Sequence, residues 1–313
     1  MSTIGLFIIY SICIASASLL GGKLTALVQL THTRTQLIMS FVAGLMLGVA
    51  CYHLLPHAIS TIGSAGAVDQ AVWWLMVGLL LMFVLLRTFH FHQHEHAGEA
   101  EHDHGHHHDH SDDGHAHETA HSHQHDAATS KPARGAHPLS WVGVAAGLTL
   151  HTLIDGIALG AAIQADDTMS ASGLISLGVF IAIVLHKPLD AMSITSLMHA
   201  SHYSTRAIAV VNTGFSLMCP LGALLFFWGA GLMGAHQPML VGSALAFSAG
   251  VFLCISLSDL LPEVQFHSHD SFKLTVALIL GVALAYGIRY LEPEHVHEEH
   301  QQQSHWTVPA HPH

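Results

Sequence analysis

Two short stretches decide the fold and the chemistry of this chain: GLTLHTLIDGIALG, which carries His151 and Asp155, and IAIVLHKPLDAMS, which carries His186 and Asp190. On an α-helix a spacing of four residues places two side chains on one face, one turn apart. Two such helices lying side by side offer imidazole nitrogens and carboxylate oxygens to a common point. The pattern therefore predicts a divalent-metal site in an otherwise apolar setting.

Composition indicates an integral membrane protein. Hydrophobic residues make up 51% of the chain and charged residues only 10%, with a mean hydropathy of +0.46, whereas soluble domains carry about 25% charged residues. A helix that crosses a hydrocarbon core needs about 20 residues. Runs of that kind occur at 4–22, 36–58, 71–91, 140–163, 173–198, 207–231, 240–263 and 272–291. The first run lacks a preceding basic region and a cleavage site, so we expect a retained span and an all-α fold of eight transmembrane helices.

We divide the chain into four regions: residues 1–91 with the first three spans, a cytoplasmic loop at 92–138, residues 139–291 with the other five spans, and an extracytoplasmic tail at 292–313. Most Lys and Arg residues fall in alternate connections between the spans. The positive-inside rule then places both termini outside the cytoplasm. The four cysteines lie within spans without paired spacing, so we expect neither disulfides nor a zinc ribbon.

The cytoplasmic loop is rich in histidine: residues 90–137 hold sixteen of the 32 His residues of the chain. It lacks the apolar residues needed for a core, so we expect disorder. Such a segment binds Zn(II), Ni(II) or Cu(II) without a unique geometry. It either buffers or senses cytoplasmic metal or is simply a solvated tether. The net charge of −12 indicates cations as partners and argues against nucleic acid.

An internal repeat relates residues 40–58 to residues 246–264 at a constant offset of 206, with seven identities in nineteen positions. A chance match between apolar segments is the alternative. Because the two spans cross the membrane in opposite directions, the repeat would be inverted, as in many secondary transporters. The polar positions also correspond, since His53 and His57 align with Asp259 and Glu263. We interpret these as candidate pathway residues, one pair facing outward and the other facing the cytoplasm.

These features together resemble the ZIP (Zrt/Irt-like) family of divalent metal transporters. The resemblance implies a 3+2+3 arrangement, in which helices 1–3 and 6–8 form an inverted repeat around a central pair that carries H-N-x-P-E-G-like motifs. On that basis the main metal site comprises His151, Asp155, His186 and Asp190. Met46 lies in a part of span two that can face this pair in the family, although Met in a bundle is usually a gap filler.

The motifs also depart from the family pattern. Thr152 replaces Asn and Ile154 replaces Pro in the first motif, and Cys219 stands before Pro220 where the family often has Glu. Lys187 occupies a position where many members carry Asn or Asp, and an ammonium has no lone pair to donate to a metal. It either substitutes for a second metal ion or forms an ion pair with Asp155 or Asp190 that holds the helices together. We therefore expect one main metal site.

The function expected from the sequence is transport of divalent transition-metal cations, with zinc moving toward the cytoplasm; Fe(II), Mn(II) and Cd(II) are alternative substrates. The rival functions are a metal exporter of the cation diffusion facilitator type and a membrane metal sensor without flux. An intramembrane metalloprotease would need H-E-x-x-H, which is absent, so we expect no enzyme. The expected partners are divalent metal ions, the lipid bilayer and, as a candidate assembly, a homodimer. No cofactor is expected beyond the transported metal.

Overall fold

The computed structural model describes residues 2–24, 32–94, 140–168, 174–266 and 271–290. Within these ranges the regular structure is entirely helical: α1 (Thr3–Leu24), α2 (His32–Val49), the π-helical turn η1 (Ala50–Leu54), α3 (Leu55–Ile62), α4 (Ala67–His94), α5 (Ser140–Thr168), α6 (Leu174–Ala200), α7 (Thr205–Ser216), α8 (Met218–Leu232), the 3₁₀ turn η2 (Gly234–His236), α9 (Gln237–Phe266) and α10 (Ser271–Tyr290). They form eight segments long and apolar enough to cross a membrane. This confirms the expected all-α membrane fold.

Two of the eight spans are interrupted. The π-helical turn η1 separates α2 from α3, and Leu217 separates α7 from α8. The first turn of α3 contains proline, which lacks a backbone N–H, and the helix ends at Gly63 in a left-handed conformation (φ 59°) that favours glycine. The hydropathy of both spans is continuous, so the sequence predicts unbroken helices here. The breaks depend on local backbone geometry that an apolar run does not encode.

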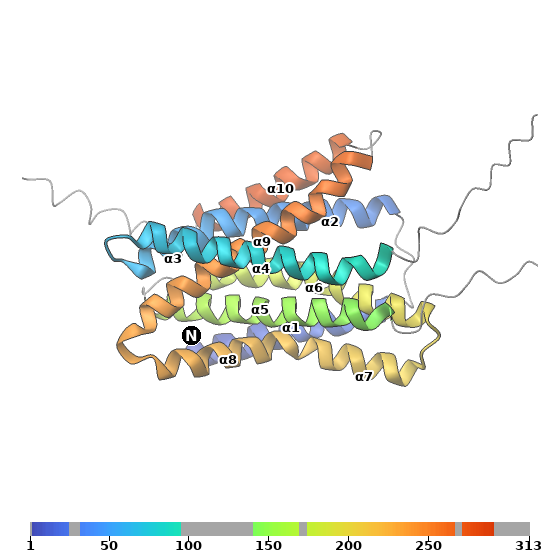
Figure 1. Ribbon diagram of the computed structural model, residues 1–313, viewed down its shortest axis with the longest axis horizontal. Coiled ribbons are helices and arrows are strands. Elements are labelled where there is room, and N and C mark those ends of the chain that lie inside the picture. The colour runs from blue at the N-terminus through green and yellow to red at the C-terminus, as the bar shows by residue number, and fades with distance from the viewer. Residues whose placement is uncertain (1, 25–31, 95–139, 169–173, 267–270, 291–313) are drawn as a thin grey trace, which may run out of the picture.

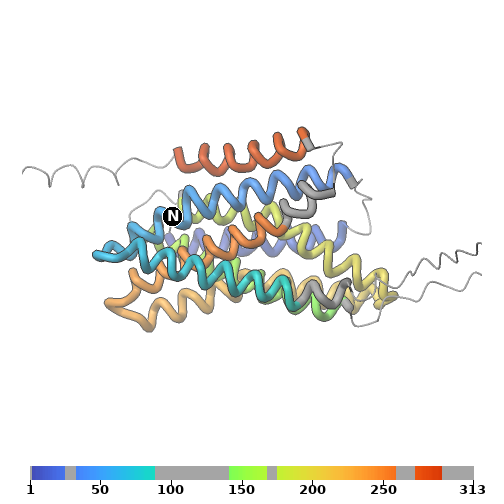
Figure 2. The backbone as a smooth tube through the Cα atoms, turned by 45° about the horizontal axis from the view of Figure 1, so that its top comes forward, coloured from blue at the N-terminus to red at the C-terminus, as the bar shows by residue number. Residues whose placement is uncertain are grey.

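The helices run along the long axis of the molecule in alternating directions (Figures 1 and 2). The first residues of α1 and the last residues of α10 lie at one end of the bundle, which we call the terminal end. The end of α4 and the start of α5 lie at the opposite end, which we call the loop end, because residues 95–139 connect them. The His-rich loop and the tail lie outside the described residues, so their assignments stay predictions.

Helices pack in four close pairs: α2 with α10, α4 with α9, α5 with α8, and α1 with α6, while α5 and α6 also contact each other. Glycines allow the closest approaches, because a Cβ there would overlap a backbone carbonyl of the facing helix. The contacts are Gly44 with Leu278, Gly281 with Phe41, Gly250 with Leu75, and Gly78 with Phe247. Small residues let membrane helices approach to backbone contact. Gly44 and Gly250 are the aligned positions of the internal repeat.

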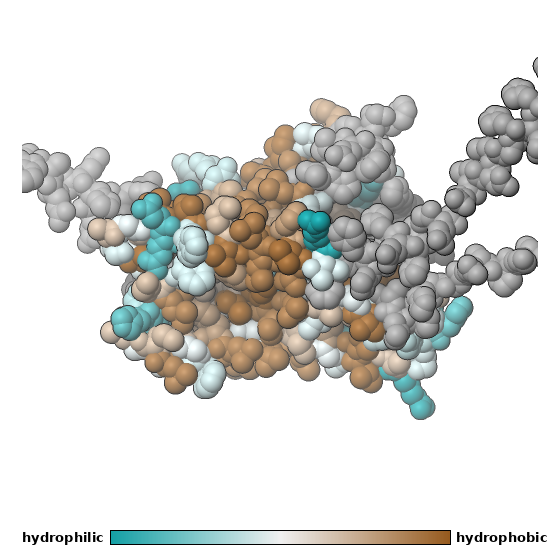
Figure 3. Space-filling model, viewed as in Figure 1, coloured by the Kyte–Doolittle hydropathy of each residue, from teal (hydrophilic) through white to brown (hydrophobic). Residues whose placement is uncertain are grey.

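The surface matches a protein surrounded by lipid. Brown, hydrophobic side chains cover the middle of the face shown in Figure 3, and hydrophilic ones lie toward its ends. Large exposed side chains in the spans include Trp73, Leu80 and Trp228. The interior core gathers residues of α2, α5, α6 and α9, including Met46, Leu159 and Phe252. The fold thus buries the motif helices α5 and α6 on several sides while leaving an apolar belt for the bilayer.

Candidate metal centre

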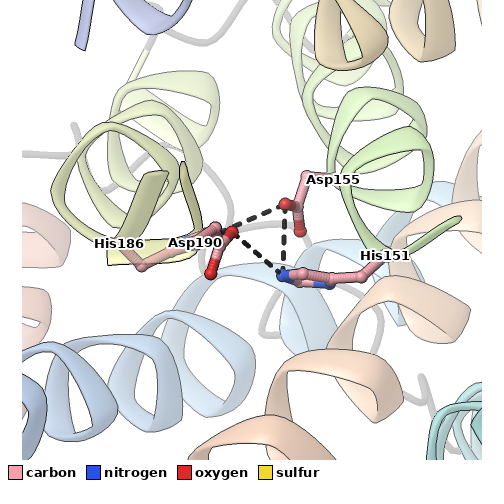
Figure 4. A group of neighbouring side chains, drawn as sticks. All are labelled: His151, Asp155, His186 and Asp190. Carbon is pink, nitrogen blue, oxygen red and sulfur yellow. Dashed lines mark hydrogen bonds and ion pairs between the residues drawn. The ribbon is translucent and has the colours of Figure 1, made fainter. Parts of the chain in front are cut away.

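The structure brings together the four residues that the sequence singles out. His151 and Asp155 project from α5, His186 and Asp190 project from the adjacent α6, and the four side chains converge between the helices (Figure 4). One ligand atom from each residue lies within 4.8 Å of all the others. Three of the residues are buried and Asp190 is partly buried. The i, i+4 spacing on each helix therefore builds the cluster as predicted.

The separations within the cluster suit a small metal ion. His186 Nε2 lies 3.2 Å and His151 Nε2 lies 3.4 Å from Asp155 Oδ2. Both Nε2 atoms lie 3.8 Å from Asp190 Oδ2. A tetrahedral zinc site with bonds of about 2.1 Å has ligand–ligand edges of about 3.4 Å. The four His–Asp separations thus lie close to such an edge, and all the atoms lie within 4.8 Å of one another.

A hydrogen bond to the other ring nitrogen fixes how His186 faces the cluster. Its Nδ1 lies 2.8 Å from the carbonyl oxygen of Ala182. A carbonyl only accepts, so Nδ1 carries the hydrogen, and in the neutral ring the Nε2 lone pair points toward Asp155. A lone pair and a carboxylate oxygen at 3.2 Å repel each other unless a proton on Nε2 makes a hydrogen bond between them or a metal ion lies between them. This arrangement favours a positive ion at the centre.

His151 lacks a comparable arrangement. Its Nδ1 is buried, and no side chain or backbone group in the described part of the chain bonds to it. The Oδ1 atom of Asp155 is likewise buried without a hydrogen-bond partner among the described residues. The α5 half of the cluster thus has two unsatisfied polar atoms beside the candidate ligands.

Lys187 lies against the same cluster. Its Nζ donates to Asp155 Oδ2 at 2.6 Å, to Thr152 Oγ1 at 3.0 Å and to Asp190 Oδ2 at 3.3 Å. It also lies 5.7 Å from the ring centroid of Phe215 on α7. The side chain is only 1% exposed. Lys187 therefore joins α5 to α6, and it pairs with both carboxylates, where the sequence suggested one or the other.

Burial around the centre differs between its two ends. Along α5, every residue from 141 to 150 is half-buried or exposed, whereas every residue from 158 to 163 is buried. The Asp190 side chain is 16% exposed and that of Asp155 is 0% exposed. Asp190 lies on the part of α6 that leads toward the loop end. The least buried ligand is therefore on that side of the cluster.

Neither His53 nor His57 joins the cluster. His53 lies in η1, fully buried, and its Nε2 donates to the carbonyl of Ala285 on α10 at 2.9 Å. Its ring packs on Gly178 of α6, which precedes His186 by eight residues, or about 12 Å along a helix. The Nδ1 atom of half-buried His57 donates to the His53 carbonyl at 2.6 Å.

The structure says less about the remaining candidate pathway residues, Met46, Asp259 and Glu263. Met46 is 1% exposed and belongs to the main apolar core. Asp259 and Glu263 lie on the last turns of α9, but their side chains lie outside the described residues. Sequence reasoning missed the contact of Thr152 with Lys187 and the role of the Ala182 carbonyl. A buried lysine on an apolar helix signals that acceptors lie opposite, but the partner helix is identified only by packing.

Fold and centre together define a multi-pass helical membrane protein with a buried two-His, two-Asp cluster between neighbouring spans. A family model described as "ZIP Zinc transporter" matches residues 2–289. The chain therefore belongs to the ZIP zinc transporter family.

Several curated relatives share part of the sequence. Zinc transporter ZIP9 of Micropogonias undulatus is 35% identical over 172 residues, which cover 49% of this chain and 53% of the relative. Zinc transporter ZIP9-B of Xenopus laevis is 37% identical over 129 residues, covering 39% and 41%. Zinc transporter ZIP1 of Homo sapiens is 30% identical over 148 residues, covering 46% and 42%. The matched stretches thus span about half the length of these relatives.

Proposed function

We propose that this protein transports divalent transition-metal cations across a membrane, with zinc as the main substrate, through the centre formed by His151, Asp155, His186 and Asp190. The observation that carries the proposal is the pair of helices that aims two Nε2 atoms and two carboxylate oxygens at one point. The family supports it, and zinc appears in the names of the relatives. We assign the chain no catalytic role.

The chemistry of the ligands fits a transported ion. Imidazole and carboxylate ligands suit zinc, and they also accept Fe(II), Mn(II) and Cd(II). The proposed set contains no thiolate, the ligand that contributes much of the zinc affinity of structural sites. A centre of this kind can load and unload its ion.

We further propose that the loop end faces the cytoplasm and that both termini face the other side. In the described ranges, five cationic residues lie at helix ends near the loop end: Lys23, Arg34, Arg87, Arg206 and Lys273. Arg289 lies near the terminal end. The positive-inside rule supports this orientation. With the least buried ligand on the loop side, the centre is poised to release its ion into the cytoplasm.

The inverted repeat of helices 1–3 and 6–8 remains part of the proposal. It is supported by the reciprocal glycine contacts, since exchanging the two halves converts the contact of Gly44 with α10 into the contact of Gly250 with α4. The same exchange converts the α1–α6 pair into the α8–α5 pair. Such symmetry suits a site that opens alternately to two sides.

The test is zinc uptake by sealed proteoliposomes that contain the purified protein and a trapped zinc-sensitive dye. Asp155→Ala and His151→Ala should abolish uptake while the protein still folds, because each removes one of four ligands. Asp167→Ala is the matched control: this exposed carboxylate lies on the same helix and accepts a hydrogen bond from Thr3. Its uptake should equal that of the wild type. Undiminished uptake by Asp155→Ala would overturn the assignment of the site.

The same vesicles distinguish the rival functions. Zinc binding without flux would indicate a membrane metal sensor. Zinc movement that requires an opposing proton gradient and runs out of the cytoplasmic face would indicate an exporter of the cation diffusion facilitator type. Repeating the assay with Fe(II), Mn(II) and Cd(II) ranks the substrates.

A further inference from the structure

Lys187 shares its acceptor atoms with the candidate metal centre. The Oδ2 atom of Asp155 faces both His Nε2 atoms, and the same atom accepts the 2.6 Å hydrogen bond from Lys187. The Oδ2 atom of Asp190 is shared in the same way. A metal ion held by these oxygens and the ammonium group would therefore draw on the same negative charge.

The charge balance of the centre depends on this lysine. With both imidazoles neutral, two carboxylates and one ammonium give a net charge of −1, and without the ammonium the empty centre would carry −2. Charge in a buried, low-dielectric site is costly unless it is paired. A divalent ion changes the net charge to +1 with Lys187 present. The lysine thus stabilises the empty centre and weakens the hold on the ion.

We propose that Lys187 is the resident counter-cation of the empty carrier, and that it alternates with the metal ion at the oxygens of Asp155 and Asp190. The proposal rests on the transport function proposed above. When the centre is empty, the ammonium pairs with both carboxylates and joins α5 to α6. The carrier without an ion can then return to its outward-open state without two unpaired carboxylates in its interior. When the ion binds, it takes over the oxygens and joins the same two helices.

Lys187 Nζ also makes two contacts that do not involve the carboxylates. Thr152 Oγ1 accepts a hydrogen bond from Nζ at 3.0 Å, and the face of Phe215 lies 5.7 Å away. Neither group belongs to the proposed ligand set. A cation over an aromatic ring is favourable in a dry site. Lys187 can therefore keep a hydrogen bond and a ring contact while the metal ion holds the carboxylates.

Equilibrium zinc binding to the purified protein in detergent tests the electrostatic part. Lys187→Gln removes the charge and should bind zinc roughly tenfold or more tightly, because a unit charge a few ångströms from the ion no longer opposes it. Lys187→Arg keeps the charge and should bind with an affinity near that of the wild type. Equal or weaker binding by a folded Lys187→Gln variant would overturn the proposal.

A second variant shifts the affinity in the opposite direction. Thr152→Val keeps every charge but removes one of the three oxygens to which Lys187 donates. When the ion holds both carboxylates, Thr152 is the acceptor of these three that remains, so its loss costs the loaded centre more than the empty one. Zinc affinity should fall about threefold, because the lost hydrogen bond is of ordinary strength. If Lys187→Gln does not fold, Thr152→Val still tests the proposed alternation. Unchanged or tighter binding by Thr152→Val would contradict the alternation between Lys187 and the ion.

Two modes of flux then separate this role from a merely structural one. Net uptake requires the empty carrier to return, whereas exchange of isotopic zinc for internal zinc requires only loaded states. Lys187→Gln should lose most of its net uptake and keep its exchange, and Lys187→Arg should keep both. Equal loss of both modes would overturn the proposal. Absence of zinc binding and flux in the wild-type protein would instead refute the proposed function.

Discussion

At the scale of single residues, the two ring nitrogens of a histidine decide what it does. In His186 the Nδ1 hydrogen bond to Ala182 directs Nε2 to the candidate metal centre. In His53 the Nε2 atom donates to the carbonyl of Ala285, and the ring is sealed between α6 and α10. The first arrangement leaves a lone pair for a ligand, whereas the second uses the nitrogen to hold two helices together.

We therefore expect His53→Ala to act on stability. Removing the donor leaves a buried carbonyl unsatisfied, which costs about 1–3 kcal/mol in the free energy of unfolding. A thermal melt of the detergent-solubilised protein measures the loss, and zinc uptake normalised to folded protein should remain close to the wild-type rate. His57→Ala, at a half-buried position, is the control and should cost less. A normal melt with reduced uptake would instead support the relay role that the internal repeat suggests for His53.

At the scale of helices, sequence and structure agree where periodicity and hydropathy carry the information. The eight spans and the convergence of His151 with His186 follow from apolar run length and from the four-residue spacing. The π-helical turn at η1 and the break at Leu217 do not follow, because hydropathy continues across both and does not encode local backbone geometry. The pairing of Lys187 with both Asp155 and Asp190 could not be predicted from the sequence either, because it depends on the register of α5 against α6.

Glycine contacts set how closely the outer helix pairs approach, and we expect them to be sensitive to a single methyl group. Gly44→Ala and Gly250→Ala would each press a Cβ on a backbone carbonyl of the facing helix. Overpacking of this kind costs about 1–3 kcal/mol. Both variants should therefore show a lower melting temperature in detergent.

Gly229→Ala is the matched control, because a Cβ at this helical position meets no atom within 4 Å. Its melting temperature should equal or slightly exceed that of the wild type, because Ala favours a helix over Gly. Unchanged melting of both Gly44→Ala and Gly250→Ala would show that these helix pairs are not as tightly packed as the structure has them.

At the scale of the whole molecule, the proposed centre lies between α5 and α6, within a bundle of paired helices. The pair α5–α6 carries the ligands, and the pairs α2–α10 and α4–α9 lie beside it. The helix α3, which carries His57, lies near the terminal end, whereas the last turns of α9, which include Glu263, lie toward the loop end (Figure 1). The proposed inverted repeat would make these two residues counterparts on opposite sides of the membrane.

Thiol labelling checks this sidedness. In a background with the four native cysteines replaced, His57→Cys should react with an impermeant reagent only from the terminal side, and Glu263→Cys only from the loop side. Conditions that raise the reactivity of one should lower that of the other, because a carrier exposes one side at a time. Reactivity rising at both positions together would indicate a continuous pore, and labelling of both from one side would contradict the topology.

The compactness of the centre along the chain has a practical consequence for design. All four candidate ligands and Lys187 fall within the forty residues from His151 to Asp190, on two neighbouring helices. No motion between distant parts of the chain is needed to assemble them. The choice of ion and the route to it should accordingly be adjustable separately. Exchanging this one segment, from His151 to Asp190, between relatives should transfer the metal preference. The recipient should keep the access route formed by its other helices.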